Sequence, residues 1–122
     1  MTGVKRVEKK SGKYIPERGD ILWLQFSPQA GHEQAGKRPA LCLSPKIYNE
    51  KTNLGLFCPI TTKQKGYPFE VPLPDNFPVK GVILTDQIRN LDWNVRKAMF
   101  IAKVPENTLK EALEKIQLLL FY

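Results

Sequence analysis

The sequence has few residues of the kinds that bind metal ions, and it has no long apolar run. Its two cysteines, Cys42 and Cys58, and its single histidine, His32, do not have the spacing of a zinc site. The sequence therefore implies no bound metal and no cofactor. We expect both cysteines to be buried, unpaired thiols, because each lies inside an apolar run. No stretch approaches the ~18 consecutive apolar residues of a membrane-spanning helix, and no apolar segment follows the charged N-terminus as in a secretory signal, so we expect a cytoplasmic protein.

Acidic residues are scarce relative to basic ones. Nineteen Lys and Arg residues against twelve Asp and Glu give a formal net charge of +7. Such an excess favours approach to a polyanion, and nucleic acid is the commonest one in a cytoplasm. A basic surface that only aids solubility is the alternative, because lysines near the N-terminus supply much of the excess. We expect residues 1–13 to form a basic, mobile arm and residues 14–122 to form a single domain.

Short apolar runs separated by proline and glycine turns indicate a β-rich domain. The predicted strands cover residues 21–26, 40–43, 54–60, 69–73, 81–85 and 99–104. Pro59 predicts an interruption of pairing near the end of the third strand, and Pro72 marks the fourth strand as an edge. Residues 44–53 have the composition of a loop with one helical turn, and residues 91–95 that of a connection.

The apolar period changes from two to about three and a half after residue 104, which predicts a C-terminal helix. Pro105 can open this helix. Its apolar face contains Leu109, Ala112, Leu113, Ile116, Leu119 and Leu120. Five or six short strands and one closing helix predict an α+β, mainly β fold, a small SH3-like barrel of antiparallel strands with a C-terminal helix. Many chemistries occur on small barrels, so this fold does not select a function.

A polar loop with two glycines, residues 31–39, lies between the first two predicted strands. Its polar side chains are His32, Glu33, Gln34, Lys37 and Arg38. These are the side-chain types needed for proton transfer beside an anion. The other reading is an ordinary hairpin connection, in which an exposed Glu and Arg form a surface ion pair worth under about 1 kcal/mol.

A second polar loop covers residues 61–68 and has the composition of a site for single-stranded RNA. Such RNA is held by stacking on aromatic side chains and by cations along its backbone. Lys63 and Lys65 supply the cations, and Tyr67 is the stacking candidate because it lies between a glycine and a proline. The other aromatic residues considered are predicted to be core: Trp23, Phe57, Phe69 and Phe100.

Six motifs follow one another in order along residues 14–104. They are Tyr14 with Gly19-Asp20, Gly31-His32-Glu33-Gln34-Ala35-Gly36-Lys37-Arg38-Pro39, Leu43-Ser44-Pro45 with Tyr48-Asn49, Pro59-Ile60-Thr61-Thr62, Lys65-Gly66-Tyr67-Pro68-Phe69-Glu70-Val71 and Asp86-Gln87-Ile88-Arg89. In this order they resemble the MazF/PemK toxins of bacterial type II toxin–antitoxin systems. The C-terminal helix agrees with that family in pattern rather than in letters. Where this chain has His32, the family commonly has serine, so the role of His32 is left open.

The resemblance implies a plasmid-maintenance-toxin fold, a homodimer, and a metal-independent endoribonuclease that cuts single-stranded RNA at short sequence motifs. It also implies a cognate antitoxin whose acidic C-terminal tail occupies the RNA groove. The family's active residues fall on Glu33, Arg38 and Thr61, and a glutamine near the groove falls on Gln87. The further candidates for RNA contacts are His32, Gln34, Lys37, Thr62, Lys63, Lys65 and Tyr67.

Metal-free RNA cleavage assigns a role to each candidate. The ribose 2′-hydroxyl attacks the adjacent phosphorus and leaves a 2′,3′-cyclic phosphate and a 5′-hydroxyl, so the enzyme moves two protons and stabilises negative charge. Arg38 suits the charge, because its guanidinium forks onto two phosphate oxygens. Glu33 either takes the 2′-hydroxyl proton or holds Arg38, and Thr61 either donates to a phosphate or only closes a strand. Arginine, with a pKa above about 12, is a poor proton donor, and His32 is the alternative.

Two other functions fit the same residues. One is a non-enzymatic poison that binds another protein. The DNA-gyrase poison CcdB, which shares the fold of this family, is an example. The other is a small-barrel nucleic-acid-binding module without chemistry.

Overall fold

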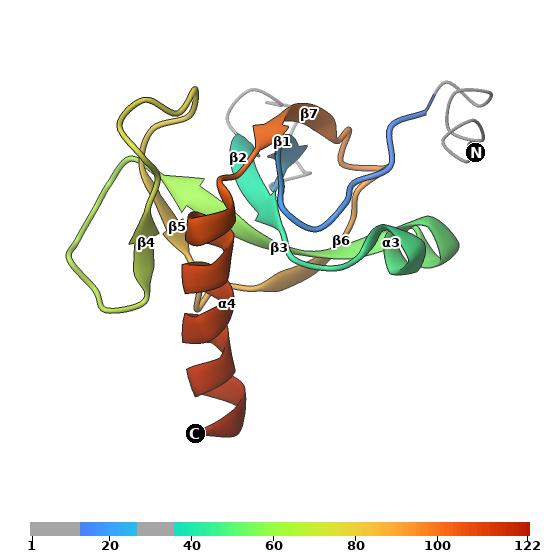
Figure 1. Ribbon diagram of the computed structural model, residues 1–122. Coiled ribbons are helices and arrows are strands. Elements are labelled where there is room, and N and C mark those ends of the chain that lie inside the picture. Colours follow the sequence, from blue (N-terminus) through green and yellow to red (C-terminus); the bar gives the residue numbers. More distant parts are fainter. Residues whose placement is uncertain (1–12, 27–35) are drawn as a thin grey trace.

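The computed structural model describes residues 13–26 and 36–122, and its main element is an antiparallel sheet. The strands are β1 (Asp20–Gln25), β2 (Lys37–Cys42), β3 (Leu54–Thr61), β4 (Glu70–Pro72), β5 (Val82–Leu84), β6 (Arg89–Asp92) and β7 (Met99–Lys103). The helices are α3 (Lys46–Thr52) and α4 (Glu106–Phe121) (Figure 1). The predicted class, antiparallel strands followed by a C-terminal helix, is confirmed. The predicted arm over residues 1–13 lies outside the described residues except for Lys13.

The strands are arranged in the order β4-β5-β3-β2-β1-β7, and β6 pairs with β3 beside this path. No pairing joins β4 to β7 in the described part of the chain, so the sheet does not close into a continuous barrel. Phe57 of β3 pairs with Cys42 on one side and Arg89 on the other, which sets β6 on the same edge of β3 as β5. The ladder with β6 ends at Phe57 and that with β5 begins at Ile60, so pairing on this edge is interrupted at Pro59, as predicted.

Two elements differ from the sequence-based expectation. Residues 46–52 form the seven-residue helix α3, longer than one turn, which ends at Asn53 in the left-handed conformation with φ 61°. β6 replaces part of the predicted connection. Leu91 is the only apolar residue of β6, so the apolar pattern is too weak to reveal a strand that depends on pairing with β3.

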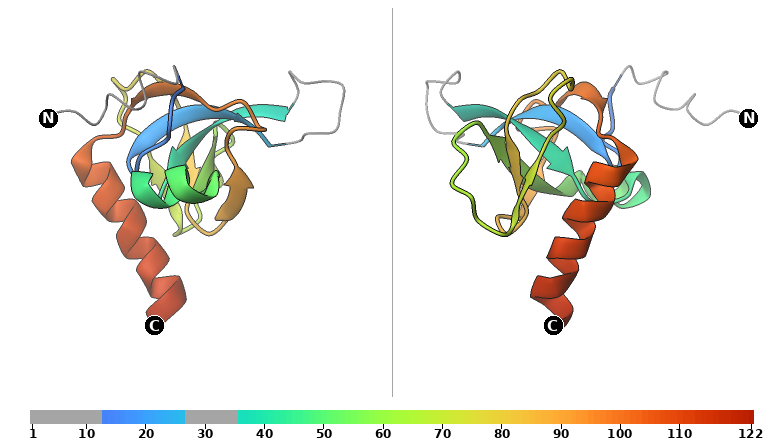
Figure 2. Two further views of the ribbon diagram at one scale, coloured as in Figure 1. Left: turned by 90° about the vertical axis from the view of Figure 1, so that its right-hand side faces the viewer. Right: turned by 60° about the vertical axis from the view of Figure 1, so that its left-hand side comes forward.

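Apolar side chains form one cluster on each face of the sheet. Successive residues of a strand enter different clusters, as Ile21 and Leu22 of β1 do. α4 covers the cluster of Ile21 with Ala112 and Ile116, and its C-terminal end projects beyond the sheet (Figures 1 and 2). In the described part of the chain no helix is both long and apolar enough to span a membrane.

Core predictions for single residues have mixed outcomes. Phe57 is fully buried as predicted, whereas Phe100 is 48% exposed on the edge strand β7 and Trp23 is half-buried. Both cysteines are free and buried, as predicted. Burial raises the pKa of the Cys42 thiol to about 11 and that of Cys58 to about 12, so both remain protonated at neutral pH and are poor nucleophiles.

The first of the six motifs attaches the N-terminal segment to the sheet. The Tyr14 hydroxyl donates to one oxygen of Asp20, and the other oxygen lies 2.7 Å from the Lys103 ammonium of β7. Burial, together with this carboxylate, raises the pKa of Tyr14, because the phenolate form is disfavoured twice. The motif is thus a structural tie between the segment before β1, β1 itself and β7.

The motif at Ser44 and Asn49 is a buried polar network. The Asn49 side chain donates to the carbonyl oxygens of Pro16 at 2.8 Å and Ser44 at 3.1 Å, and it accepts from the Ser44 hydroxyl at 2.6 Å. Trp93 donates from its indole nitrogen to the Asn49 carbonyl at 3.1 Å. The network joins the segment before β1, α3 and the segment after β6.

Replacing Asn49 with alanine is expected to lower the free energy of unfolding by about 3 kcal/mol, because it leaves buried carbonyl and hydroxyl groups without partners. Urea denaturation measures this change. Asn76→Ala, at an exposed position in a turn, is the matched control and should change stability by less than about 0.5 kcal/mol. Equal stability of the two variants would show that the network is dispensable.

Candidate functional site

Two adjoining hollows lie where the start of β2, the end of β3 and the loops around β5 meet. One, of about 210 Å³, is lined by Arg38, Thr61, Lys63, Lys65, Tyr67, Glu70, Leu84 and Gln87. The other, of about 270 Å³, is lined by Lys37, Arg38, Pro39, Ile60, Thr61, Thr62, Lys63 and Lys80. Arg38, Thr61 and Lys63 line both. We call the two hollows together the Arg38–Thr61 groove.

Arg38 of β2 and Thr61 of β3 line both hollows. The β2–β3 pairing ends at Ala40 and Pro59, and beyond it Arg38 pairs with β1 and Thr61 with β5. Both positions belong to hydrogen-bonded strands rather than to free loops. The relative position of these two residues is therefore set by the sheet.

Every predicted site residue in the described ranges lines this groove. They are Lys37, Arg38, Thr61, Thr62, Lys63, Lys65, Tyr67 and Gln87. The prediction joined residues of four separate motifs, and the fold brings all four to one place. His32, Glu33 and Gln34 lie outside the described residues.

The charge of the groove is strongly positive. Among the residues that the structure describes, five cations line it, namely Lys37, Arg38, Lys63, Lys65 and Lys80, against one carboxylate, Glu70, which is buried. Such a surface attracts phosphates. No group of three or more His, Cys, Asp or Glu that could hold a metal ion occurs within residues 13–26 and 36–122.

The cations differ in how they are held. The Lys37 ammonium lies 5.6 Å from the centre of the Trp23 ring, and Lys80 donates to the Asp75 carbonyl at 2.6 Å. Arg38 is exposed and has no hydrogen-bond or ion-pair partner in the part of the chain that the structure describes. An exposed guanidinium is able to make a bidentate contact with a phosphate.

The Thr61 hydroxyl accepts one hydrogen bond within the fold and keeps its own proton for donation. It accepts a hydrogen bond at 3.1 Å from the backbone N–H of Lys63, which turns the chain after β3. Its own proton is not used by this bond, and the side chain is half-buried in the groove. Closing the strand and donating to a phosphate are therefore compatible roles.

Two charged residues of the groove were not predicted as site residues. Lys80 precedes β5 in a turn, where a single lysine carries no sequence signal. Glu70 was expected only as the polar residue of an edge strand, yet it is 8% exposed and accepts hydrogen bonds from the backbone of Lys65 and Gly66. The sequence pattern that could have indicated this role is a glutamate four residues after a glycine of a polar loop.

Comparison with known proteins agrees with this geometry. The family model described as "PemK-like, MazF-like toxin of type II toxin–antitoxin system" matches residues 17–120. The chain belongs to this family. The resemblance of the six motifs to MazF/PemK toxins is thereby confirmed.

Relatives of this MazF/PemK-family chain cover nearly its whole length. The endoribonuclease toxin MazF of Escherichia coli K12 is 44% identical over 108 residues, which are 88% of this chain and 96% of the relative. The crystal structure of MazF from Deinococcus radiodurans matches with a TM-score of 0.82 at 50% identity, over 90% of this chain and 100% of that one. A MazE–MazF structure from the same organism matches with a TM-score of 0.80 at 44% identity, over 89% and 98% of the two chains.

Proposed function

We propose that this MazF/PemK-family chain is an endoribonuclease toxin that cuts single-stranded RNA without a metal ion at short sequence motifs. The observation that carries the proposal is the Arg38–Thr61 groove, which places an exposed guanidinium and a threonine hydroxyl among four lysines of the described residues. The names of the relatives support it, because MazF of E. coli is named an endoribonuclease toxin. The toxin acts in the cytoplasm, where its RNA substrate is found.

The proposed reaction uses the ribose of the substrate as the nucleophile. The 2′-oxygen bonds to the adjacent phosphorus, the bond from phosphorus to the 5′-oxygen breaks, and the products carry a 2′,3′-cyclic phosphate and a 5′-hydroxyl. Arg38 binds two phosphoryl oxygens as negative charge develops, and the Thr61 hydroxyl donates to one of them. DNA is not cut, because it lacks the 2′-hydroxyl.

Two proton transfers complete the reaction. Glu33 takes the proton of the 2′-hydroxyl, and the leaving 5′-oxygen takes one from a donor for which His32 is the candidate, since imidazole titrates near neutral pH. Both residues lie outside the described residues. Their polar loop leads directly into β2, and therefore to Arg38.

The rest of the groove binds the RNA on either side of the cut. Tyr67 is 53% exposed and stacks on a base, while Lys37, Lys63 and Lys65 neutralise phosphates. Gln34, Thr62 and Gln87 supply neutral hydrogen-bonding groups for bases and sugars. A groove of this sign also suits the acidic C-terminal tail of a cognate antitoxin. The related MazE–MazF structure supports such a partner.

Purified protein incubated with RNA and with DNA of the same sequence, in excess EDTA, tests the proposal. RNA should be cut into fragments with 5′-hydroxyl ends, and DNA should remain intact. Sequencing of those ends from a long RNA defines the recognition motif. Intact RNA across many sequences, or cleavage only after a divalent ion is added, would contradict the proposal.

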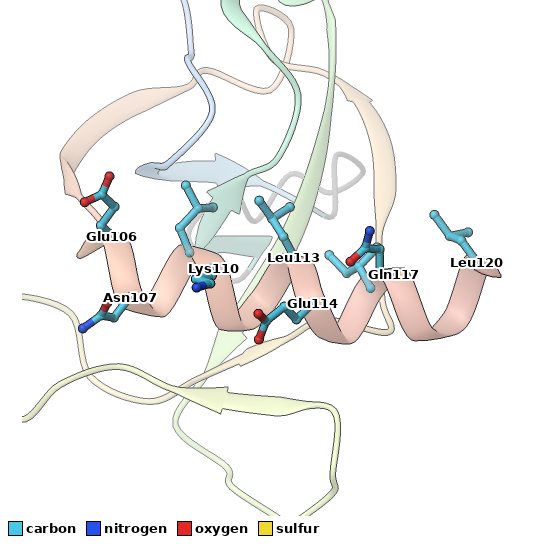
Figure 3. A pocket seen from close by; sticks show the side chains of 9 residues that line it. Glu106, Asn107, Lys110, Leu113, Glu114, Gln117 and Leu120 are labelled. Atoms are coloured by element: carbon cyan, nitrogen blue, oxygen red, sulfur yellow. The ribbon is translucent and has the colours of Figure 1, made fainter. Parts of the chain in front are cut away.

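The C-terminal part of α4 supports the proposed homodimer. A hollow of about 820 Å³ runs along the helix, and Leu113, Gln117 and Leu120 point to the same side of it (Figure 3). All of its lining residues come from α4, so it encloses no small substrate. Leu120 and Phe121 are 67% and 79% exposed, a costly arrangement for an isolated chain in water.

Light scattering at micromolar concentration is expected to give twice the chain mass of 14.0 kDa. Leu120→Glu should weaken the dimer by at least about tenfold, because a charge would be buried at the interface. Ile47→Glu introduces the same charge at an exposed apolar residue of α3 and should leave the dimer intact. A monomeric mass for the unaltered protein would overturn the homodimer.

A further inference from the structure

Glu70 is a carboxylate buried at the base of the loop that joins β3 to β4. One oxygen accepts hydrogen bonds from the backbone N–H of Lys65 at 3.2 Å and of Gly66 at 2.9 Å, and the other accepts from Lys65 at 3.1 Å. No cation forms an ion pair with it in the described ranges. A buried charge is costly unless it is hydrogen-bonded, so the charge of Glu70 is satisfied by the backbone of this loop.

The loop is shaped around this carboxylate. Gly66 has φ +81°, a left-handed conformation that turns consecutive amide groups toward one point. The backbone N–H of Glu70 donates to the Tyr67 carbonyl at 3.1 Å and closes the turn. At the C-terminal end of the loop, the Thr85 hydroxyl donates to the Phe69 carbonyl at 2.6 Å. This bond holds the start of β4, the strand to which Glu70 belongs.

Two side chains next to the turn that Glu70 anchors face the same hollow as the proposed reacting groups. Lys65 and Tyr67 line it together with Arg38 and Thr61. Arg38 is held by the β1–β2 ladder and Thr61 by the β3–β5 ladder, whereas Lys65 and Tyr67 belong to the loop between β3 and β4, at the far left of Figure 1. The hollow thus has one wall set by the sheet and one wall set by Glu70.

We propose that Glu70 is a positioning residue for RNA binding, because its carboxylate holds Lys65 and Tyr67 at the wall of the Arg38–Thr61 groove. This inference rests on the proposed RNA cleavage. It separates the two walls by role: the loop anchored by Glu70 governs how tightly RNA binds, and the strands govern how fast bound RNA is cut.

Glu70→Gln tests the proposal with a side chain of the same size. Glutamine keeps one acceptor oxygen and presents an NH₂ group to a backbone N–H, so the charged bonds are lost. The KM for single-stranded RNA should rise about tenfold while kcat changes less than about twofold. Glu50→Gln, an exposed glutamate of α3, is the matched control and should leave both constants unchanged. An unchanged KM, or a loss confined to kcat, would overturn the proposal.

A second background separates positioning from general destabilisation. With Lys65→Ala and Tyr67→Ala already present, Glu70→Gln should change KM by less than about twofold more, because it acts through those side chains. The same factor in both backgrounds would overturn the proposal. If Glu70→Gln does not fold, Glu70→Asp replaces it, keeping the charge but shortening the reach, with a KM increase of about threefold expected.

Amide hydrogen exchange tests the anchor without any RNA. The N–H groups of Lys65 and Gly66 should be protected in the unaltered protein and exchange at least about tenfold faster in Glu70→Gln, with the β2–β3 amides unchanged. Equal rates in the two proteins would overturn the proposal. Failure to cut RNA with protection intact would instead count against the proposed function.

Discussion

Arg38→Ala is expected to lower kcat/KM for RNA cleavage by at least about a thousandfold, because it removes the cation that we propose binds the charge developing on the phosphoryl group. The fold should survive. Arg38 is exposed at the start of β2 and has no partner in the described part of the chain, so truncation leaves no buried group unsatisfied. The free energy of unfolding should change by less than about 0.5 kcal/mol. Steady-state cleavage of a short RNA and urea denaturation measure the two quantities.

Lys37→Ala is the matched control, since Lys37 is the neighbouring exposed cation of the same groove. It should lower kcat/KM only about threefold, through weaker and less salt-sensitive RNA binding. Retention of a tenth or more of the activity by Arg38→Ala would contradict the assignment of Arg38. A module that only binds nucleic acid would lose part of its affinity in both variants and show no cleavage. A protein-binding poison would keep its toxicity in both.

The order of motifs along the sequence located the groove better than any single residue type could. Arg38 and Thr61 were assigned from two motifs more than twenty residues apart, and the neighbouring strands β2 and β3 bring them to the lining of the same hollows. The remaining described candidates follow because loops that leave neighbouring strands at the same end of a sheet meet there. Local patterns also revealed α4, since its apolar period is long and regular.

The features that the sequence did not reveal depend on partners distant along the chain. In the sequence, Glu70 is a polar residue in a strand of alternating polar and apolar residues. Only the path of the preceding loop brings two backbone N–H groups within hydrogen-bonding distance of its carboxylate. Asn49 is fully buried because the Pro16 carbonyl, thirty-three residues away, accepts its hydrogen bond. Phe100 lies in an apolar run, yet its strand is the last of the sheet and the side chain is exposed. The apolar period of a sequence predicts on which face of a strand a side chain lies, but it does not predict what covers that face.

Gly81 links the stability of the fold to the geometry of the groove. It precedes β5 with φ +121°, and a Cβ atom there would lie 2.3 Å from the carbonyl oxygen and 2.8 Å from the carbonyl carbon of Thr61. Val82 pairs with Thr61 in the β3–β5 ladder, and the Gly81 carbonyl accepts a hydrogen bond from Leu73 at 3.0 Å. Any side chain at this position must therefore separate the start of β5 from the end of β3, where Thr61 lies.

Gly81→Ala is expected to lower the free energy of unfolding by about 3 kcal/mol, because backbone strain adds to a clash with atoms that cannot rotate away. Gly19→Ala is the matched control. Gly19 also has positive φ, +94°, but its Cβ would meet only the Leu109 side chain at an ordinary 3.5 Å. Its cost should be about 1 kcal/mol, the strain alone. Cleavage measured well below both melting temperatures should fall in Gly81→Ala, through displacement of Thr61, and stay unchanged in Gly19→Ala. Equal stability and equal activity of the two variants would show that the close approach of β5 to Thr61 matters neither to the fold nor to the site.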